Sequence, residues 1–248
     1  MKYRFLLTFD DGPHANTAPV LDLLARNPVQ EGIKAIFFVQ TRNAEGGGCR
    51  IGRVLLQREH AEGHVLGLHT GTARGHVGHT SMSPPDLARS LQDGMADIRA
   101  ITNDNPWLVR PPYWCFNAAT VAEYERQGLC MMLSDVKAYD GIDWGLHRFT
   151  RWTFRSQLAV AHRRLLRREI PSSRGIAPII VTLHDTNAYT AGHLSEYLEL
   201  LIAEAGRAGL SLDHKPYYDE APEMLSAALK RAGRHFQAAS PRGRQTVA

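Results

Sequence analysis

The chain has 248 residues, of which 44% are hydrophobic, and this is enough for one substantial core. No segment approaches the roughly 18 apolar residues of a membrane span, and the three widely spaced cysteines argue against a disulfide framework. The net charge of +4 comes largely from arginine pairs and the C-terminal segment, a pattern typical of solvated helix faces, so we expect no nucleic-acid partner.

Short apolar segments alternate with amphipathic segments along the chain. We expect strands at residues 6–9, 34–39, 64–69, 107–110, 131–136 and 178–184. We expect helices at residues 17–26, 52–62, 83–101, 117–127, 151–168, 193–208 and 221–236. This order predicts an α/β fold whose parallel sheet closes, or nearly closes, into a barrel of about seven βα units. An open doubly wound sheet is the alternative.

The chain shows neither an internal linker nor a sequence repeat. We therefore expect residues 1–238 to form a single catalytic domain and residues 239–248 to be a disordered polar and basic tail. The first residues lead directly into an acidic segment, so we expect no signal peptide in this chain. The protein would then be cytoplasmic if the chain is complete, and secreted or periplasmic if a leader has been removed.

Polar residues of chemical interest lie at the ends of predicted strands or directly after them. They are Asp10, Asp11, His69, Arg110, Asp135 and His184. In a barrel these strand ends share one face, where active sites gather. Asp10 and Asp11 precede a Gly-Pro turn, and two carboxylates in one turn can divide the work, one binding a metal and the other handling protons. A plain acidic turn with a helix-capping carboxylate is the alternative for this motif alone.

The segment TFDDGPH at residues 8–14, together with TAPVLDLL at 17–24 and KAIFFV at 34–39, resembles the polysaccharide deacetylase family. This family is also called carbohydrate esterase family 4, or the NodB-homology domain. The resemblance extends through five ordered motifs from about Tyr3 to His184, and it implies a distorted (β/α) barrel. It also implies that Asp10 is the general base and that Asp11 is a metal ligand.

The second motif begins at Gly63 and His64, reaches His69 and Thr70, and departs from the family pattern. A second metal histidine usually follows four residues later, but that position is Ala73 here. Aligning backward from SMSPPDL at residues 81–87 places His76 in the ligand position, with about three inserted residues, and His79 is the alternative. Two imidazoles and one carboxylate typically bind one divalent metal. We expect zinc, with cobalt, nickel, iron and manganese as alternatives.

The segment from Arg110 to Tyr113, with sequence RPPY, resembles the third motif of the family. The resemblance implies that Arg110 holds the catalytic aspartate, a role that suits a guanidinium because it is always charged and can bind a carboxylate through two donors. It also implies that the backbone N–H of Tyr113 faces the oxyanion, and we place Pro111 at the substrate. An ordinary extended Pro-Pro loop is the alternative.

The fourth motif is the least well defined. Asp135 best fits a carboxylate at a strand end, and we expect it to support the general acid, while Asp140 and Asp143 are alternatives for this role. We place Trp144 at the substrate.

The expected buried strand at residues 179–185 carries His184 near its end and resembles the fifth motif of the family. The resemblance implies that His184 is the general acid and that Leu183 lines a small apolar pocket for the acetyl methyl group.

Together these motifs imply a metal-dependent hydrolase that removes acetyl groups, by N-deacetylation with O-deacetylation as an alternative, from an amino-sugar-containing polysaccharide or oligosaccharide. The expected partner is an N-acetylated glycan, and no obligatory protein partner is evident. Two alternatives remain open. One is an amide hydrolase or deformylase with the same fold, and the other is a non-catalytic carbohydrate-binding protein.

Overall fold

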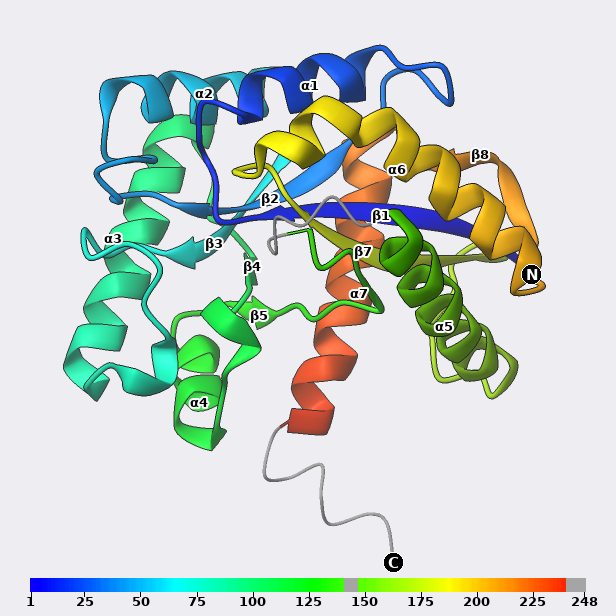
Figure 1. The fold of residues 1–248 in the computed structure, drawn as a ribbon. Helices are drawn as coiled ribbons and strands as arrows, with labels where there is room; N and C mark the ends of the chain where they lie inside the picture. The colour runs from blue at the N-terminus through cyan, green and yellow to red at the C-terminus, as the bar shows by residue number, and fades with distance from the viewer. Residues whose placement is uncertain (141–146, 240–248) are drawn as a thin grey trace, which may run out of the picture. The chain divides into compact units, whose positions relative to one another are not determined.

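The computed structural model describes residues 1–140 and 147–239, and Figure 1 shows its elements. The strands are β1 (Lys2–Asp10), β2 (Ala35–Gln40), β3 (Val65–Thr70), β4 (Leu108–Val109), β5 (Cys130–Met131), β6 (Val136–Lys137), β7 (Ile176–His184) and β8 (Leu212–Tyr217). The helices are α1 (Thr17–Ala25), α2 (Arg50–Ala61), α3 (Pro84–Thr102), α4 (Ala118–Arg126), α5 (His147–Leu166), α6 (Ala188–Arg207) and α7 (Ala221–Ala239). The predicted α/β alternation is confirmed.

The elements group into two compact units, each made from separate stretches of chain. The first, which we call the His184 unit, contains residues 1–10, 16–36 and 134–228. The second, the His69 unit, contains residues 11–15, residues 37–133 and the chain from residue 229 onward. The boundary falls between Asp10 and Asp11, so the two consecutive carboxylates belong to different units.

The His184 unit is organised around the pairing of β1 with β7. These strands run parallel and in register, from Lys2 beside Ile176 to Asp10 beside His184. Their central residues are fully buried, as expected for a parallel sheet that is covered on both faces. Strand β6 pairs with β7, β8 pairs with β1, and α6 packs against both α1 and α5 (Figure 1). The register places Asp10 and His184 at the same level, at the ends of neighbouring strands.

The His69 unit contains β3, β4 and β5, which pair in parallel in that order. Helix α3 packs on β3 and also contacts α2, while α4 packs beside β5. A Cβ atom at Gly71 would lie 2.2 Å from the carbonyl oxygen of Ser90 in α3, so only glycine allows this close approach. The chain leaving β3 is thereby held against α3, and this segment leads into the loop that carries His76.

Two strand predictions are corrected by the structure. The predicted strand at residues 131–136 is two short strands, β5 in the His69 unit and β6 in the His184 unit. Between them, the Ser134 hydroxyl donates to the carbonyl oxygens of Val136 and Ile180 instead of continuing a ladder. Strand β8 was missed because its six residues, LDHKPY, show no apolar alternation.

One helix prediction is corrected as well. Helix α6 begins at Ala188, earlier than expected, because Asn187 caps it. The Asn187 side chain accepts hydrogen bonds from the backbone N–H groups of Tyr189 and Thr190. His193, where we expected the helix to begin, instead has non-helical backbone angles inside it.

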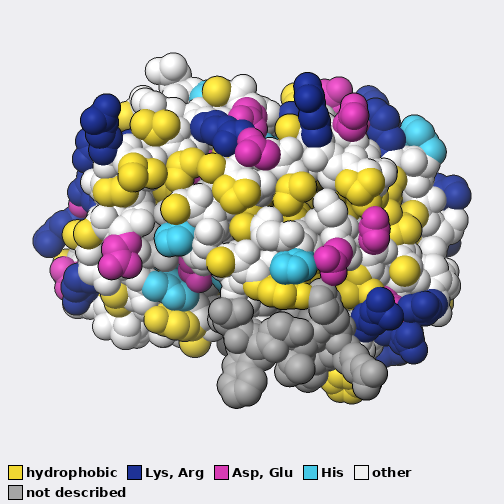
Figure 2. All heavy atoms as spheres, turned by 45° about the horizontal axis from the view of Figure 1, so that its top comes forward, with side chains coloured by type: hydrophobic (Ala, Val, Ile, Leu, Met, Phe, Trp, Pro, Cys, Tyr) yellow, Lys and Arg dark blue, Asp and Glu magenta, His cyan; other side chains and the backbone are white. Residues whose placement is uncertain are grey.

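Two observations bear on the expected absence of a nucleic-acid partner and of a membrane span. On the face shown in Figure 2, Lys and Arg side chains occur in separate groups with other side-chain types between them. Within residues 1–140 and 147–239, no helix is both long and apolar enough to cross a membrane. The expected tail at residues 239–248 lies outside the described residues, except for Ala239 at the end of α7.

Candidate metal centre and acid–base pair

Three side chains of the metal-ligand type converge in the His69 unit. Asp11 directly follows Asp10, His69 lies in β3, and His76 lies in the loop after β3. The Nε2 atoms of His69 and His76 lie 3.1 and 3.2 Å from Oδ1 of Asp11, and 3.1 Å from each other. The side chain of His69 is 3% exposed, whereas those of Asp11 and His76 are 23% and 28% exposed. The cluster is therefore closed on one side and accessible on the other.

The spacing of these three atoms fits a divalent metal. Ligand atoms that bind zinc at about 2.0–2.2 Å lie roughly 3 to 3.5 Å from one another. The Nδ1 atom of His69 lies 2.7 Å from the Arg110 carbonyl oxygen, which can only accept, so Nδ1 carries the proton. Nε2 is then the ring nitrogen that faces the Asp11 carboxylate and can bind a metal. A hydrogen bond of this kind fixes both the tautomer and the ring of a metal-binding histidine.

The turn that carries Asp11 is held in place by Gln40. Asp11 has a backbone φ of 74°, in the left-handed region that is uncommon for residues other than glycine. The Gln40 side chain donates to the Asp11 carbonyl oxygen at 3.1 Å, and its backbone N–H donates to the Gly12 carbonyl oxygen at 2.8 Å. Such a backbone conformation persists only where neighbouring groups enforce it. Sequence reasoning missed Gln40, because a glutamine at the end of an apolar strand has no distinctive signal.

His79, the alternative ligand, takes a different position from His76. Its side chain is fully buried, and Nδ1 lies 2.6 Å from the Tyr124 hydroxyl. Burial, followed by the nearby His69, lowers the pKa of His79 to about 3, so the imidazole is neutral at physiological pH. Of the two candidates, the structure brings His76 to Asp11 and His69.

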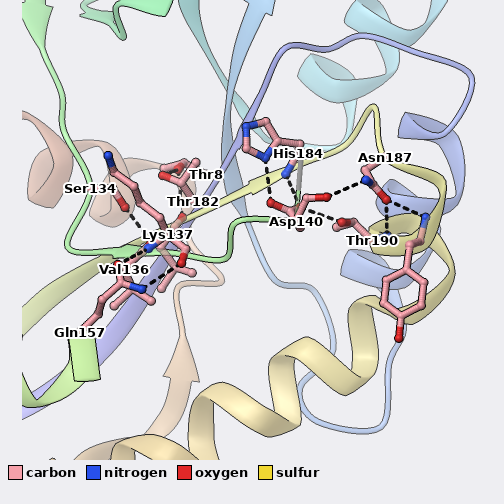
Figure 3. A network of polar contacts seen from close by, with 12 residues as sticks. Thr8, Ser134, Val136, Lys137, Asp140, Gln157, Thr182, His184, Asn187 and Thr190 are labelled. Atoms are coloured by element: carbon pink, nitrogen blue, oxygen red, sulfur yellow. Dashed lines mark hydrogen bonds and ion pairs between the residues drawn. The ribbon is translucent and has the colours of Figure 1, made fainter. Parts of the chain in front are cut away.

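A histidine–carboxylate pair occupies the end of β7 in the His184 unit. Nδ1 of His184 lies 2.8 Å from Oδ1 of Asp140, and the His184 backbone N–H donates to Oδ2 at 2.7 Å. The Thr190 hydroxyl also donates to Oδ2 at 2.7 Å, and the Asn187 amide donates to the Asp140 carbonyl oxygen at 2.6 Å. Figure 3 shows these groups converging on Asp140. Because Nδ1 faces the carboxylate, Nε2 is the ring nitrogen that can serve a substrate.

The structure corrects the expectation for Asp135. Its buried carboxylate pairs with Arg164 at 2.8 Å and accepts the Ile180 backbone N–H at 3.0 Å, so it supports the middle of β7. Asp140 lies beyond the end of β6, where Lys137 pairs in register with Thr182, and it therefore reaches the level of His184. Asp143, the third candidate, and Trp144 lie outside the described residues.

Thr190 and Asn187 were also missed by sequence reasoning. The spacing of Asn187 before α6 is a recognisable helix-capping signal. Nothing in the sequence, however, links this cap to an aspartate 47 positions earlier.

Arg110 is fully buried in the His69 unit. Its Nε donates to the Met132 carbonyl oxygen at 3.1 Å, and the guanidinium lies 4.1 Å from the ring centre of Phe38 and 5.0 Å from that of Trp114. These contacts fix the guanidinium. Its expected hold on the catalytic aspartate stays a prediction.

The remaining predicted site residues differ in exposure. Tyr113 has a left-handed backbone with a φ of 57°, and its side chain is exposed. Asp10 is nearly buried, with 3% exposure, at the end of β1. Leu183 and Pro111 are buried, so their contact with an acetyl group or a sugar stays a prediction.

Residues 2–132 match the family model described as polysaccharide deacetylase. The chain belongs to this family. The matched segment carries Asp10, Asp11, both candidate metal histidines and Arg110, whereas Asp140 and His184 lie beyond it. The assignment of the acid–base pair in this deacetylase-family protein therefore rests on the register of β1 with β7 and on the contacts of Asp140.

Known relatives agree with this membership. A chitin deacetylase from a Pestalotiopsis species is 30% identical over 136 residues, which cover 55% of this chain and 43% of the relative. A peptidoglycan-N-acetylglucosamine deacetylase from Bacillus cereus is 34% identical over 107 residues, which cover 43% of this chain and 35% of the relative. The chain thus spans less than half the length of either relative.

Solved structures agree as well. The chitin deacetylase from Colletotrichum lindemuthianum superposes with a TM-score of 0.63 at 22% identity, covering 84% of each chain. At this identity the likeness concerns the fold alone, and it confirms the expected fold of the polysaccharide deacetylase type.

The two loop histidines of this family member can be separated by mutation. We expect His76→Ala to weaken zinc binding by at least about 100-fold, because one of three protein ligands is lost. We expect His79→Phe to retain zinc affinity within a few-fold and to lower the free energy of unfolding by about 1–3 kcal/mol, because the buried hydrogen bond between His79 and the Tyr124 hydroxyl is lost. Chelator competition and denaturant unfolding measure the two effects. Equal loss of zinc affinity in both variants would contradict the assignment of His76.

Proposed function

We propose that this protein is a metal-dependent hydrolase that removes acetyl groups from an N-acetylated glycan. The observation that carries the proposal is the convergence of Asp11, His69 and His76 on one point, directly after a second carboxylate, Asp10. Family membership supports hydrolytic deacetylation, and the named activities of the chitin and peptidoglycan relatives support an N-acetylglucosamine-containing substrate.

The proposed reaction divides between the metal ligands and two proton-transfer groups. A divalent cation held by Asp11, His69 and His76 would supply Lewis-acid stabilisation of the charge that develops on the acyl oxygen. Asp10 accepts a proton from the attacking water, and its near-complete burial at a strand end fixes its orientation. We also assign the Tyr113 backbone N–H to stabilising the oxyanion.

His184 completes the reaction by donating a proton to the leaving amine. An amide nitrogen is a poor leaving group until it is protonated, so a positioned acid is required. The Asp140 carboxylate faces Nδ1 and favours the charged imidazole, while Nε2 is left for the substrate. Because Asp140 also accepts from Thr190 and from the His184 backbone, it holds the ring in one orientation.

Removal of the metal tests the proposal. We expect the purified protein to contain about one divalent metal per chain and to lose acetate release from N-acetylated chitooligosaccharides after treatment with chelator. Zinc or cobalt should restore the activity, and Asp11→Asn should need a much higher metal concentration for partial restoration. Acetylated xylan and peptidoglycan fragments, assayed in parallel, define the substrate class.

Two outcomes would overturn the proposal. Release of formate from formylated amides, without acetate release from any glycan, would indicate the deformylase alternative. Glycan binding without hydrolysis, in protein shown to hold its metal, would indicate a carbohydrate-binding protein.

A further inference from the structure

The loop between the two candidate metal histidines is longer than the family pattern, and this raises the question of what fixes its second ligand. His69 and His76 are separated by seven positions, where the family usually has four. Residues 71–75 lie beyond β3, which ends at Thr70. Every additional loop residue adds conformational freedom that must be lost when a ligand atom is held in place. Contacts made by His76 itself therefore help to define its position.

Tyr113 makes such contacts with both the ring and the backbone of His76. The two rings are stacked, with centroids 4.2 Å apart and planes inclined by 30°. The Tyr113 hydroxyl donates to the His76 carbonyl oxygen at 2.8 Å. On its other side, the His76 ring stacks on His69 with centroids 5.0 Å apart. The imidazole of His76 thus lies between the first metal histidine and a tyrosine.

The position of Tyr113 is itself well defined. It lies in a turn that is closed by hydrogen bonds from the Trp114 and Cys115 N–H groups to the carbonyl oxygens of Pro111 and Pro112. At the start of the same segment, the Arg110 carbonyl oxygen accepts from Nδ1 of His69. One four-residue segment, 110–113, therefore contacts both histidines, through a carbonyl group at one end and a phenol ring at the other.

The far end of the loop is anchored separately. His79 is fully buried and hydrogen-bonded to Tyr124 of α4, so it fixes the chain three residues beyond His76. This anchor limits the path of the loop but does not set the side-chain torsions of His76. The ring of His76 is contacted by Asp11, His69 and Tyr113, and these contacts orient it.

We infer that the side chain of Tyr113 is a positioning residue for the metal site, where it holds His76 in the orientation that ligation requires. This inference rests on the proposed function, because it presupposes that Asp11, His69 and His76 bind a metal. It is separate from the role of the Tyr113 backbone N–H, which any side chain at position 113 would retain. Tyr113 is 60% exposed, and the alternative role for its ring is to stack on a sugar of the substrate.

Zinc affinity distinguishes the two interpretations without reference to activity. Apoprotein prepared with chelator is titrated with zinc in competition with a chromogenic chelator. We expect Tyr113→Leu to weaken zinc binding by about 10- to 100-fold, the range found when groups that orient metal ligands are lost. Tyr113→Phe keeps the stacked ring and loses one hydrogen bond, so we expect it to recover most of the affinity and to stay within about 10-fold of wild type.

A matched control and a spectroscopic measurement complete the experiment. Trp107→Leu removes another exposed aromatic side chain of the His69 unit and should leave zinc affinity unchanged. In cobalt-loaded protein, the visible spectrum reports ligand geometry, and it should change in Tyr113→Leu and be preserved in Tyr113→Phe.

The possible results separate the failure of this inference from the failure of the proposed function. If wild-type protein binds no zinc, or if Asp11→Asn binds zinc as well as wild type, the metal site itself is wrong. If wild type binds zinc through Asp11 and Tyr113→Leu binds it equally well, the positioning role of Tyr113 is overturned. A higher KM for glycan in that variant with unchanged zinc affinity would indicate sugar stacking instead.

Discussion

Replacing Asp10 with asparagine is expected to lower kcat by about 10²- to 10⁴-fold while metal content stays at the wild-type level, the range lost when a positioned general base is removed. Asparagine has nearly the same shape as aspartate but cannot accept a proton from water. Asp10 is nearly buried at the end of a fully paired strand, so the substitution should be tolerated structurally. Acetate release and metal analysis on the same preparation measure both quantities.

Asp11→Asn is the matched control, because it changes the neighbouring carboxylate in the same way. It should lower metal affinity first and turnover as a consequence, so excess zinc should recover part of its activity and none of that of Asp10→Asn. Retained turnover in Asp10→Asn would contradict the assignment of Asp10 as the general base. Loss of metal from Asp10→Asn would show that both carboxylates act as ligands.

Asp140→Asn is also expected to lower kcat by about 10²- to 10⁴-fold, an effect as large as that of Asp10→Asn. The asparagine loses the negative charge that stabilises protonated His184, and its amide group can present a donor to Nδ1 and so favour the wrong tautomer. The ring would then be less able to donate a proton through Nε2. Steady-state kinetics with an N-acetylated chitooligosaccharide measure the effect, and thermal unfolding shows whether the fold is retained.

Asp135→Asn provides the comparison, since this aspartate is equally buried and supports the same strand. It should keep kcat within a few-fold of wild type and lower the free energy of unfolding by about 1–3 kcal/mol, because the ion pair between Asp135 and Arg164 is lost. If Asp135→Asn abolished turnover and Asp140→Asn did not, the assignment made from the sequence would be restored and the one made from the contacts of His184 would be wrong.

The parts of the fold that could be predicted from the sequence are those with strong local signals. Strands β1 and β7 each contain an apolar run that is buried on both faces, and such runs indicate parallel strands without knowledge of their partners. Strand β8 carries no such signal, because its pairing with β1 compensates for a polar, proline-containing sequence. The break between β5 and β6 was equally hidden, since each strand has only two residues and the two pair with different neighbours.

The candidate site divides in the same way. Four of the site residues lie at strand ends or next to them, so their approximate place could be predicted from the sequence; they are Asp10, Asp11, His69 and His184. His76 and Asp140 lie in loops, where spacing gives no direction. His76 was distinguished from His79 by its contacts with Asp11 and His69 and by the burial of His79 against Tyr124. Asp140 was distinguished from Asp135 by the contacts of each carboxylate. These are tertiary contacts between residues far apart in the chain.

The cap of α6 ties the integrity of a helix end to the proton donor. The first turn of a helix is ordinarily where fraying begins, because its N–H groups lack partners within the helix. Here Asn187 satisfies two of those N–H groups and also holds the Asp140 backbone, while Thr190, in the same turn, holds the Asp140 carboxylate. Unwinding this single turn would remove the Asn187 and Thr190 hydrogen bonds to Asp140 while β1 and β7 stayed paired, and only the contacts with His184 itself would still hold the carboxylate. The orientation of the proposed general acid therefore depends on one turn of helix, although the strand that carries it belongs to the core.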